Sequence, residues 1–127
     1  MMARMSEDAW WKPHRDREAA FDRIVEPAHK RLAARLAAAL DRAVWSGHFG
    51  ATGIDPKHLF VYVVLPRRSD VAGLAGSPRW ERFKHETELD LAAAGYPVAS
   101  LPSTWLGCFS QQECDERHGG NWYHFFK

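Results

Sequence analysis

Two cysteines and one histidine near the C-terminus are the residues whose types and spacing come nearest to a metal site. Cys114 and His118 stand four positions apart and would share one face of a helix, while Cys108 lies upstream of them. A structural zinc site normally needs two such pairs of ligands, and this cluster has no second pair. We therefore predict no metal and no cofactor, and we interpret Cys108 as a small buried apolar residue.

A nucleophile with its base could be assembled from the same segment. Cys114 or Ser110 would be the nucleophile, and His118 or His124 would remove its proton. Neither a G-x-S-x-G turn nor the pattern of a known cysteine enzyme surrounds these residues. Because Ser110 is also well placed to cap a helix, we predict no covalent catalysis.

General acid–base catalysis is the other chemistry that this segment could support. Asp115, Glu116 and His118 fall within one helical turn and could move protons in a small hydrolase or nuclease. Charged residues on a short helix are usually solvated surface, however. We therefore predict no catalytic residues and keep this enzyme as an alternative.

Charge is distributed unevenly along the chain. No Lys or Arg occurs between Glu86 and Glu116, a stretch with six acidic residues, Glu86, Glu88, Asp90, Glu113, Asp115 and Glu116. These residues form two groups in the sequence, residues 86–90 and residues 113–116. If folding brings the two groups together beside Trp122 and Tyr123, the protein would attract a basic protein by charge and hold it by aromatic anchors. The predicted partner-binding residues are Glu86, Glu88, Asp90, Asp115, Glu116, His118, Trp122 and Tyr123.

The aromatic residues near the C-terminus also allow a different partner. Trp122, Tyr123 and Phe125 could stack on the bases of a single-stranded nucleic acid. Only Arg117 and Lys127 supply fixed positive charge nearby, so nucleic-acid binding is an alternative. A row of exposed aromatic residues flanked by the basic residues Lys30, Arg31 and Arg35 would favour it.

The elements around these residues follow from local patterns. Thr104–Phe109 is apolar and predicts a strand, and Asn121–Phe126 is almost continuously aromatic and predicts another. Between them, Ser110 and Glu113 match a capping box, and Gly119-Gly120 would end the helix that they begin.

The N-terminal half predicts one long helix. Residues 1–15 are interpreted as a flexible arm, and residues 16–127 as a single domain. Apolar residues recur every three or four positions over Asp16–Trp45, which is the spacing of one helix face. Pro27 predicts a break or kink at Glu26-Pro27, because proline lacks the backbone N–H that the helix needs.

The middle of the chain contains the best strand. His58–Leu65 is a continuous apolar run, which predicts a central strand buried on both faces. We expect Gly47–Lys57 and Arg67–Pro78 to be loops, because both are rich in turn-forming residues. Residues 77–95 favour a helix, with a strand followed by a short helix as the alternative.

Composition limits the overall interpretation. The chain has 127 residues and a net charge of +1, so charge alone does not direct it to nucleic acid or to membranes. It contains neither a long apolar span nor a secretory signal, so we predict a cytoplasmic protein with no membrane partner.

We expect an α+β fold, with a long kinked N-terminal helix on a sheet of three or four strands and two further short helices. The expected function is to bind another protein with a basic surface, as an inhibitor or immunity-type protein.

Overall fold

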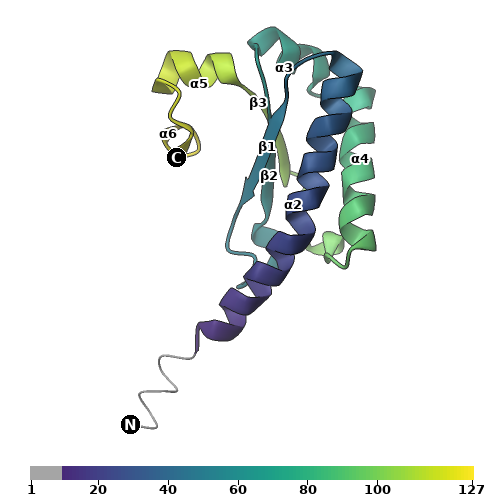
Figure 1. The fold of residues 1–127 in the computed structure, drawn as a ribbon, viewed down its shortest axis with the longest axis vertical. Helices are drawn as coiled ribbons and strands as arrows, with labels where there is room; N and C mark the ends of the chain where they lie inside the picture. The colour runs from purple at the N-terminus through teal and green to yellow at the C-terminus, as the bar shows by residue number, and fades with distance from the viewer. Residues whose placement is uncertain (1–9) are drawn as a thin grey trace.

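The computed structural model describes residues 10–127 and confirms the α+β fold. A long helix, a three-stranded mixed sheet and further short helices make up the described chain (Figure 1). Two short 3₁₀ helices, Pro56–His58 and Val98–Ser100, lie within the connections.

The long helix α2 spans Lys12–Leu40. It begins earlier than predicted, because Pro13 fits the first turn of a helix, where no N–H is required. It passes through Pro27 without interruption and bends along its course in Figure 1. The prediction that it runs to Trp45 is wrong, since Asp41 takes the left-handed conformation, with φ of 52°, and ends it. The first nine residues of the predicted arm lie outside the described residues.

The sheet has the order β1-β2-β3, with β1 at Trp45–Phe49, β2 at Phe60–Leu65 and β3 at Leu106–Ser110. Strand β1 is antiparallel to β2, and β3 is parallel to it. The predicted central position of this strand is therefore confirmed, whereas the predicted burial on both faces is incomplete, because Phe60 and Tyr62 are only half-buried. The predicted loop Gly47–Lys57 is partly wrong, because its first residues belong to β1 and pair along β2.

Helices α3, at Arg68–Leu74, and α4, at Pro78–Ala93, connect β2 to β3. The prediction of a loop over Arg67–Pro78 is wrong where α3 lies; the Asp70 carboxylate accepts a hydrogen bond from the backbone N–H of Arg67 at 3.0 Å and helps to start this helix. The favoured helix in residues 77–95 is confirmed. Ser77 caps it by accepting a hydrogen bond from the backbone N–H of Trp80 at 3.1 Å.

The C-terminal segment forms two helices, α5 at Gln111–His118 and α6 at Trp122–Phe125. Ser110 accepts from the backbone N–H of Glu113 at 3.1 Å, and Gly119 ends α5 in the left-handed conformation, as predicted. The predicted strand Asn121–Phe126 is wrong. The Asn121 side chain instead accepts from the backbone N–H of His124 at 3.1 Å and begins a helical turn.

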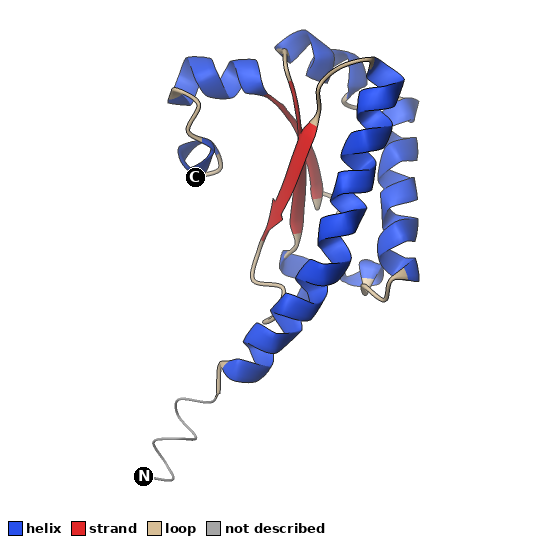
Figure 2. Cartoon of the chain, in the orientation of Figure 1, coloured by secondary structure: helices blue, strands red, loops and turns tan. Residues whose placement is uncertain are grey.

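The two faces of the sheet are covered unequally. Figure 2 shows α2 and α4 side by side against one face, while the C-terminal segment lies on the other side of the strands. The core lies between the sheet and these two helices, where Leu32 and Leu36 of α2 and Val61 and Val63 of β2 are buried. Since successive side chains of a strand point to opposite faces, the remaining residues of β2 must find other partners.

Replacing Ser110 with Ala is expected to lower the free energy of unfolding by about 0.5–2 kcal/mol, because the backbone N–H of Glu113 loses its acceptor. Denaturant unfolding measures this change. Ser69→Ala, at an exposed position within α3, is the matched control and should leave the midpoint nearly unchanged. Equal midpoints for Ser110→Ala and the wild type would contradict the cap.

Candidate functional site

Aromatic side chains occupy the face of the sheet that α2 and α4 do not cover. The register places Phe49 of β1 opposite Phe60 of β2, and their ring centroids are 5.1 Å apart. Phe109 of β3 lies 6.2 Å from Phe60, and Trp45 lies 5.8 Å from Tyr62. Three strands thus contribute to one continuous aromatic surface.

Two glycines make room for these rings. Gly47 pairs with Tyr62 on one side and Gly107 pairs with it on the other. A Cβ at Gly47 would stand 2.5 Å from the Cζ of Tyr62, and one at Gly107 would stand 2.7 Å from the Phe109 ring. Residues larger than glycine at these positions would displace the rings, so the sequence of the strands is adapted to this surface.

Helix α6 adds a second layer of rings. Trp122 contacts Trp45 with the centroids 5.2 Å apart, and Phe126 contacts Tyr62 at 4.7 Å. Phe125 lies 5.4 Å from Phe109. We call the set the aromatic face; it comprises Trp45, Phe49, Phe60, Tyr62, Phe109, Trp122, Phe125 and Phe126.

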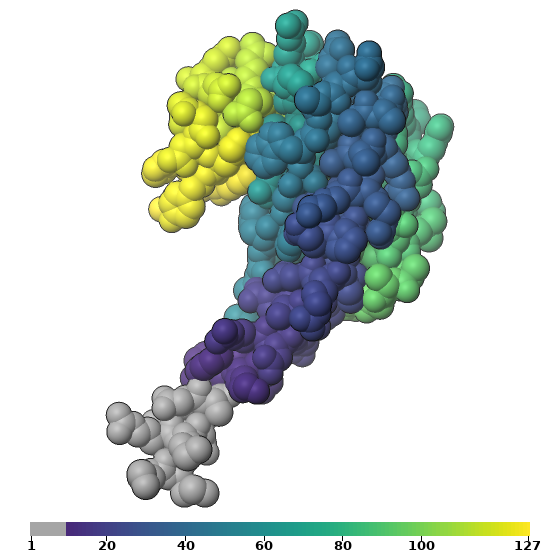
Figure 3. All heavy atoms as spheres, viewed as in Figure 1, coloured from purple at the N-terminus to yellow at the C-terminus, as the bar shows by residue number. Residues whose placement is uncertain are grey.

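The aromatic face is only partly covered. Trp45 is 40% exposed and Phe49 is 46% exposed, while Tyr123 at its rim is 68% exposed. A hollow lies beneath α6, and Figure 3 shows the C-terminal segment overhanging it; its walls are Phe49, Tyr62, Trp122, Tyr123, Phe126 and Lys127. Burial raises the pKa of Tyr62, which keeps its phenol neutral. Contiguous apolar surface of this kind commonly marks a binding site.

One cation lies at the rim of the hollow. The Lys127 ammonium is 4.8 Å from the centre of the Tyr123 ring, a cation–π contact. Within residues 10–127, no carboxylate forms a salt bridge with it. The charge is therefore available to a ligand.

The predicted acidic residues of α4 are largely engaged within the protein. Asp90 accepts from Arg35 at 2.9 Å and from Arg31 at 3.3 Å. Burial acts to raise the pKa of Asp90, but these two hydrogen bonds outweigh it and lower the pKa. Glu88 accepts from the indole N–H of the buried Trp105 at 3.3 Å, and Glu86 is half-buried on the same helix.

The predicted residues of α5 lie elsewhere. Glu116 pairs with Arg68 at 2.9 Å, and Asp115 accepts from the Gln111 amide at 2.8 Å. Figure 1 places α5 and α4 on opposite sides of the strands, so the two acidic groups do not form one patch. Of the predicted set, the structure brings together Trp122, Tyr123 and His118, whose ring is 5.6 Å from that of Phe125.

The groups needed for the enzymatic alternatives are not assembled. In the described chain, no hydrogen bond joins His118 to Asp115 or Glu116. Burial raises the pKa of the Cys108 thiol to about 12, and burial with the nearby Asp115 raises that of Cys114. Both thiols are thus poor nucleophiles near neutral pH.

The basic residues of the nucleic-acid alternative are also separated from the aromatic rings. Arg31 and Arg35 pair with Asp90, and Lys30 pairs with Glu26 at 3.1 Å. All three belong to α2, which packs on the other face of the sheet.

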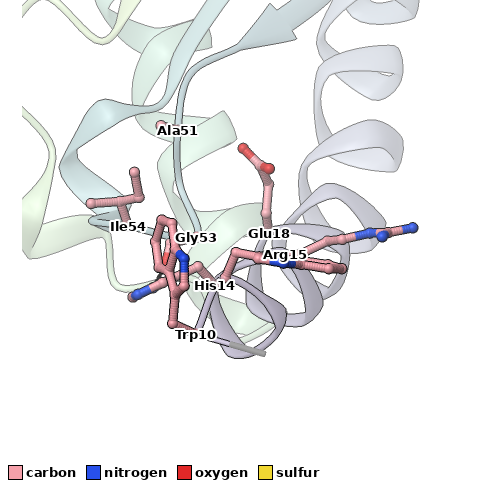
Figure 4. Close-up of a pocket in the computed structure, with 8 residues that line it drawn as sticks. Trp10, His14, Arg15, Glu18, Ala51, Gly53 and Ile54 are labelled. Carbon is pink, nitrogen blue, oxygen red and sulfur yellow. Dashed lines mark hydrogen bonds between the residues drawn. The ribbon is translucent and has the colours of Figure 1, made fainter. Parts of the chain in front are cut away.

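A second, smaller hollow lies where α2 begins. Figure 4 shows Trp10, His14 and Ile54 around Gly53, whose carbonyl accepts from Arg17 at 2.8 Å. Trp10 is 69% exposed and Ile54 is 66% exposed. The residues that line this hollow lie apart from the aromatic face.

Sequence reasoning missed the contribution of β1. Trp45 was expected to end a helix, and Phe49 was expected in a loop. The strand between them, Trp45–Phe49, gave only a weak local signal, because Gly47 interrupts it. A cluster of Glu26, His29 and His48 between α2 and β1 was missed as well, although Glu26 and His29 have ligand spacing on a helix.

Comparison of the chain with models of protein families, with curated proteins and with solved structures finds no match. Within residues 10–127, no helix has the length and apolar character required to cross a membrane.

Proposed function

We propose that the protein is a protein-binding module whose aromatic face takes up an extended apolar segment of a partner polypeptide. The observation that carries this proposal is the unequal covering of the sheet: two helices cover one face, whereas the single-turn helix α6 leaves aromatic rings exposed on the other. Exposed Trp and Tyr side chains are the residues that most often dominate binding energy at protein interfaces.

The edge of the sheet favours an extended segment. Strand β1 is an edge strand, and in the described part of the chain no strand pairs with its outer side. A shallow groove runs beside that edge, where Ala33, Ala34 and Ala37 of α2 face Trp45 and Ser46. A partner strand that pairs with β1 would place alternate side chains in this groove and over the aromatic face.

Charge further defines the partner. The Lys127 ammonium lies at the rim without a salt-bridge partner among the described residues, so we expect a carboxylate beside the apolar segment of the partner. The expected basic surface has less support, because Asp90 and Glu116 are neutralised by arginines of the same chain. A protein partner is favoured over nucleic acid, because the basic residues of α2 lie on the other face of the sheet.

Occupation of the aromatic face would also cover part of the partner, and this is how an inhibitor or immunity-type protein acts. We place this activity in the cytoplasm. The free thiols Cys108 and Cys114 support that assignment, since a reducing compartment keeps cysteines unpaired.

The test compares capture of partner proteins from the native host by five purified variants. Phe49→Ala and Tyr123→Ala remove exposed rings and should each weaken capture roughly 30-fold, the equivalent of about 2 kcal/mol for an aromatic anchor. Leu89→Ala is the matched control, because Leu89 is 56% exposed on α4 and should leave capture unchanged. Lys127→Glu should weaken capture of the same protein, whereas Arg82→Glu on α4 should not.

A partner captured equally by all variants would overturn the proposal. Self-association of the purified wild type that Phe49→Ala abolishes would also overturn it, because the occupant would then be a second copy of the chain. Capture of nucleic acid instead of protein by the wild type would favour the nucleic-acid alternative.

A further inference from the structure

Three potential ligand groups meet between α2 and β1. Glu26 and His29 stand three positions apart on one face of α2, and His48 projects toward them from β1. The Nε2 of His29 is 3.2 Å from Glu26 Oε2, and the Nδ1 of His48 is 3.8 Å from the same oxygen. One ligand atom of each residue lies within 4.8 Å of the others.

The tautomer of His29 depends on where the Ser46 hydroxyl directs its hydrogen. The Ser46 hydroxyl donates its one hydrogen to the His29 carbonyl oxygen at 3.1 Å. With its hydrogen there, it accepts from Nδ1 of His29, which lies 2.7 Å away. In that tautomer Nε2 presents its lone pair to the Glu26 carboxylate; in the other tautomer the Ser46 hydroxyl donates to Nδ1, and Nε2–H donates to Glu26.

In the tautomer with the hydrogen on Nδ1, the Nε2 lone pair and the Glu26 oxygen lie 3.2 Å apart and can bind one cation between them. The Nδ1 of His48 faces the same Glu26 oxygen, so three ligand atoms converge on one point. His29 contributes to this cluster from a buried position, with only 3% of the residue exposed. The geometry thus points to a metal ion, and we propose that Glu26, His29 and His48 bind a divalent transition-metal ion.

The ligand types and spacing define the class of metal. Two imidazole nitrogens with one carboxylate suit Zn²⁺, Fe²⁺ or Co²⁺ better than Mg²⁺ or Ca²⁺, which prefer oxygen ligands. With bonds of about 2.0–2.2 Å, ligand atoms around zinc stand roughly 3.3 Å apart. Glu26 and His29 already have this spacing, and rotation of the half-exposed Glu26 would bring its carboxylate closer to His48.

Outer contacts orient both imidazoles for this role. A metal-bound histidine usually donates its other N–H to a fixed acceptor. Ser46 is that acceptor for His29, and Asp22 is that acceptor for His48, with Oδ1 3.1 Å from Nε2. Three protein ligands leave further coordination positions for water or a substrate.

The site is separate from the proposed protein-binding face. Ser46 and His48 alternate along β1 with Trp45, Gly47 and Phe49, so they point to the helical side of the sheet. Ser46 also borders the groove beside β1, so the metal site is tested on the purified chain without a partner.

Calorimetric titration of the untagged, chelator-treated full chain with Zn²⁺ tests the site. We expect saturable binding of one Zn²⁺ per chain, weakened at least tenfold in Glu26→Gln and in His48→Gln, since even outer-shell changes cost roughly 10- to 100-fold. Asp22→Asn changes such an outer contact and should weaken Zn²⁺ binding by roughly 10- to 100-fold. His85→Gln on α4 is the control and should bind like the wild type.

Titration with Co²⁺ provides a second readout, because its visible absorption reports nitrogen and oxygen coordination directly. The wild-type spectrum should be lost in His48→Gln and kept in His85→Gln. Three results would overturn the proposal: no stoichiometric binding by the wild type, unchanged binding by both ligand variants, or an equal loss in the control.

Discussion

Replacing Val63 with Asp is expected to abolish cooperative folding. Val63 lies in the central strand, is fully buried and packs in the core between the sheet and α2. The buried cluster around Val63 consists of apolar residues, and an unpaired buried charge costs several kcal/mol. The total stability of a domain is only about 5–15 kcal/mol, so one such change can remove most of it.

Soluble expression and thermal unfolding measure this effect. Leu89→Asp introduces the same group at an exposed position of α4 and should shift stability by no more than about 0.5 kcal/mol. A soluble Val63→Asp protein with a sharp unfolding transition would contradict the central placement of β2.

Replacing Gly50 with Ala should destabilise the protein by about 2 kcal/mol or more, because it combines backbone strain with a collision. Gly50 has φ of 125°, a value that side-chain-bearing residues rarely adopt. Its new Cβ would also overlap the carbonyl group of His58, whose carbon would be 2.8 Å away. This residue directs the chain from β1 toward β2, so the alignment of Phe49 with Phe60 depends on it.

The same substitution at Gly73 should raise the stability of the protein instead of lowering it. Gly73 lies inside α3, and a Cβ there meets nothing within 4 Å. Gly73→Ala should stabilise the protein by about 0.4–1 kcal/mol, since alanine loses less backbone entropy in a helix. Denaturant unfolding of both variants distinguishes the two effects, and equal shifts would contradict the geometry at Gly50.

The sequence predicted correctly the helices and strands whose conformation depends on neighbouring residues in the chain. The strand at β2 was evident from its apolar run, and the helix α5 from Ser110 and Gly119. Strand β1 was missed because its five residues contain a glycine and carry no strong alternation. Its pairing with β2 and its packing on α2 decide its conformation, and neither is visible locally.

The C-terminal aromatic residues show a different limit. Aromatic content favoured a strand over Asn121–Phe126, but the side chain of Asn121 accepts from the backbone N–H of His124 and begins a helical turn. Turning as a helix lets Trp122, Phe125 and Phe126 all reach the rings on the sheet. The aromatic composition was therefore informative about the site, whereas the conformation followed from the cap and from tertiary packing.

The acidic residues were grouped by sequence, and the fold separates them. A stretch without Lys or Arg does not show which arginines from other parts of the chain will contact its acidic residues. Arg31 and Arg35 neutralise Asp90. Arg68 neutralises Glu116. Likewise, Glu26 and His29 are a visible pair, but His48 joins them only through the packing of β1 on α2.

Hydroxyl-radical footprinting of the protein alone and in complex with its captured partner tests the central claim most directly. The side chains of Trp45, Phe49 and Tyr123 are exposed enough to be oxidised in the free protein. We predict that the partner protects these three residues and leaves Leu89, Trp10 and Ile54 as reactive as before. Unchanged oxidation of the aromatic face, with protection at Leu89 or around Trp10, would contradict the account.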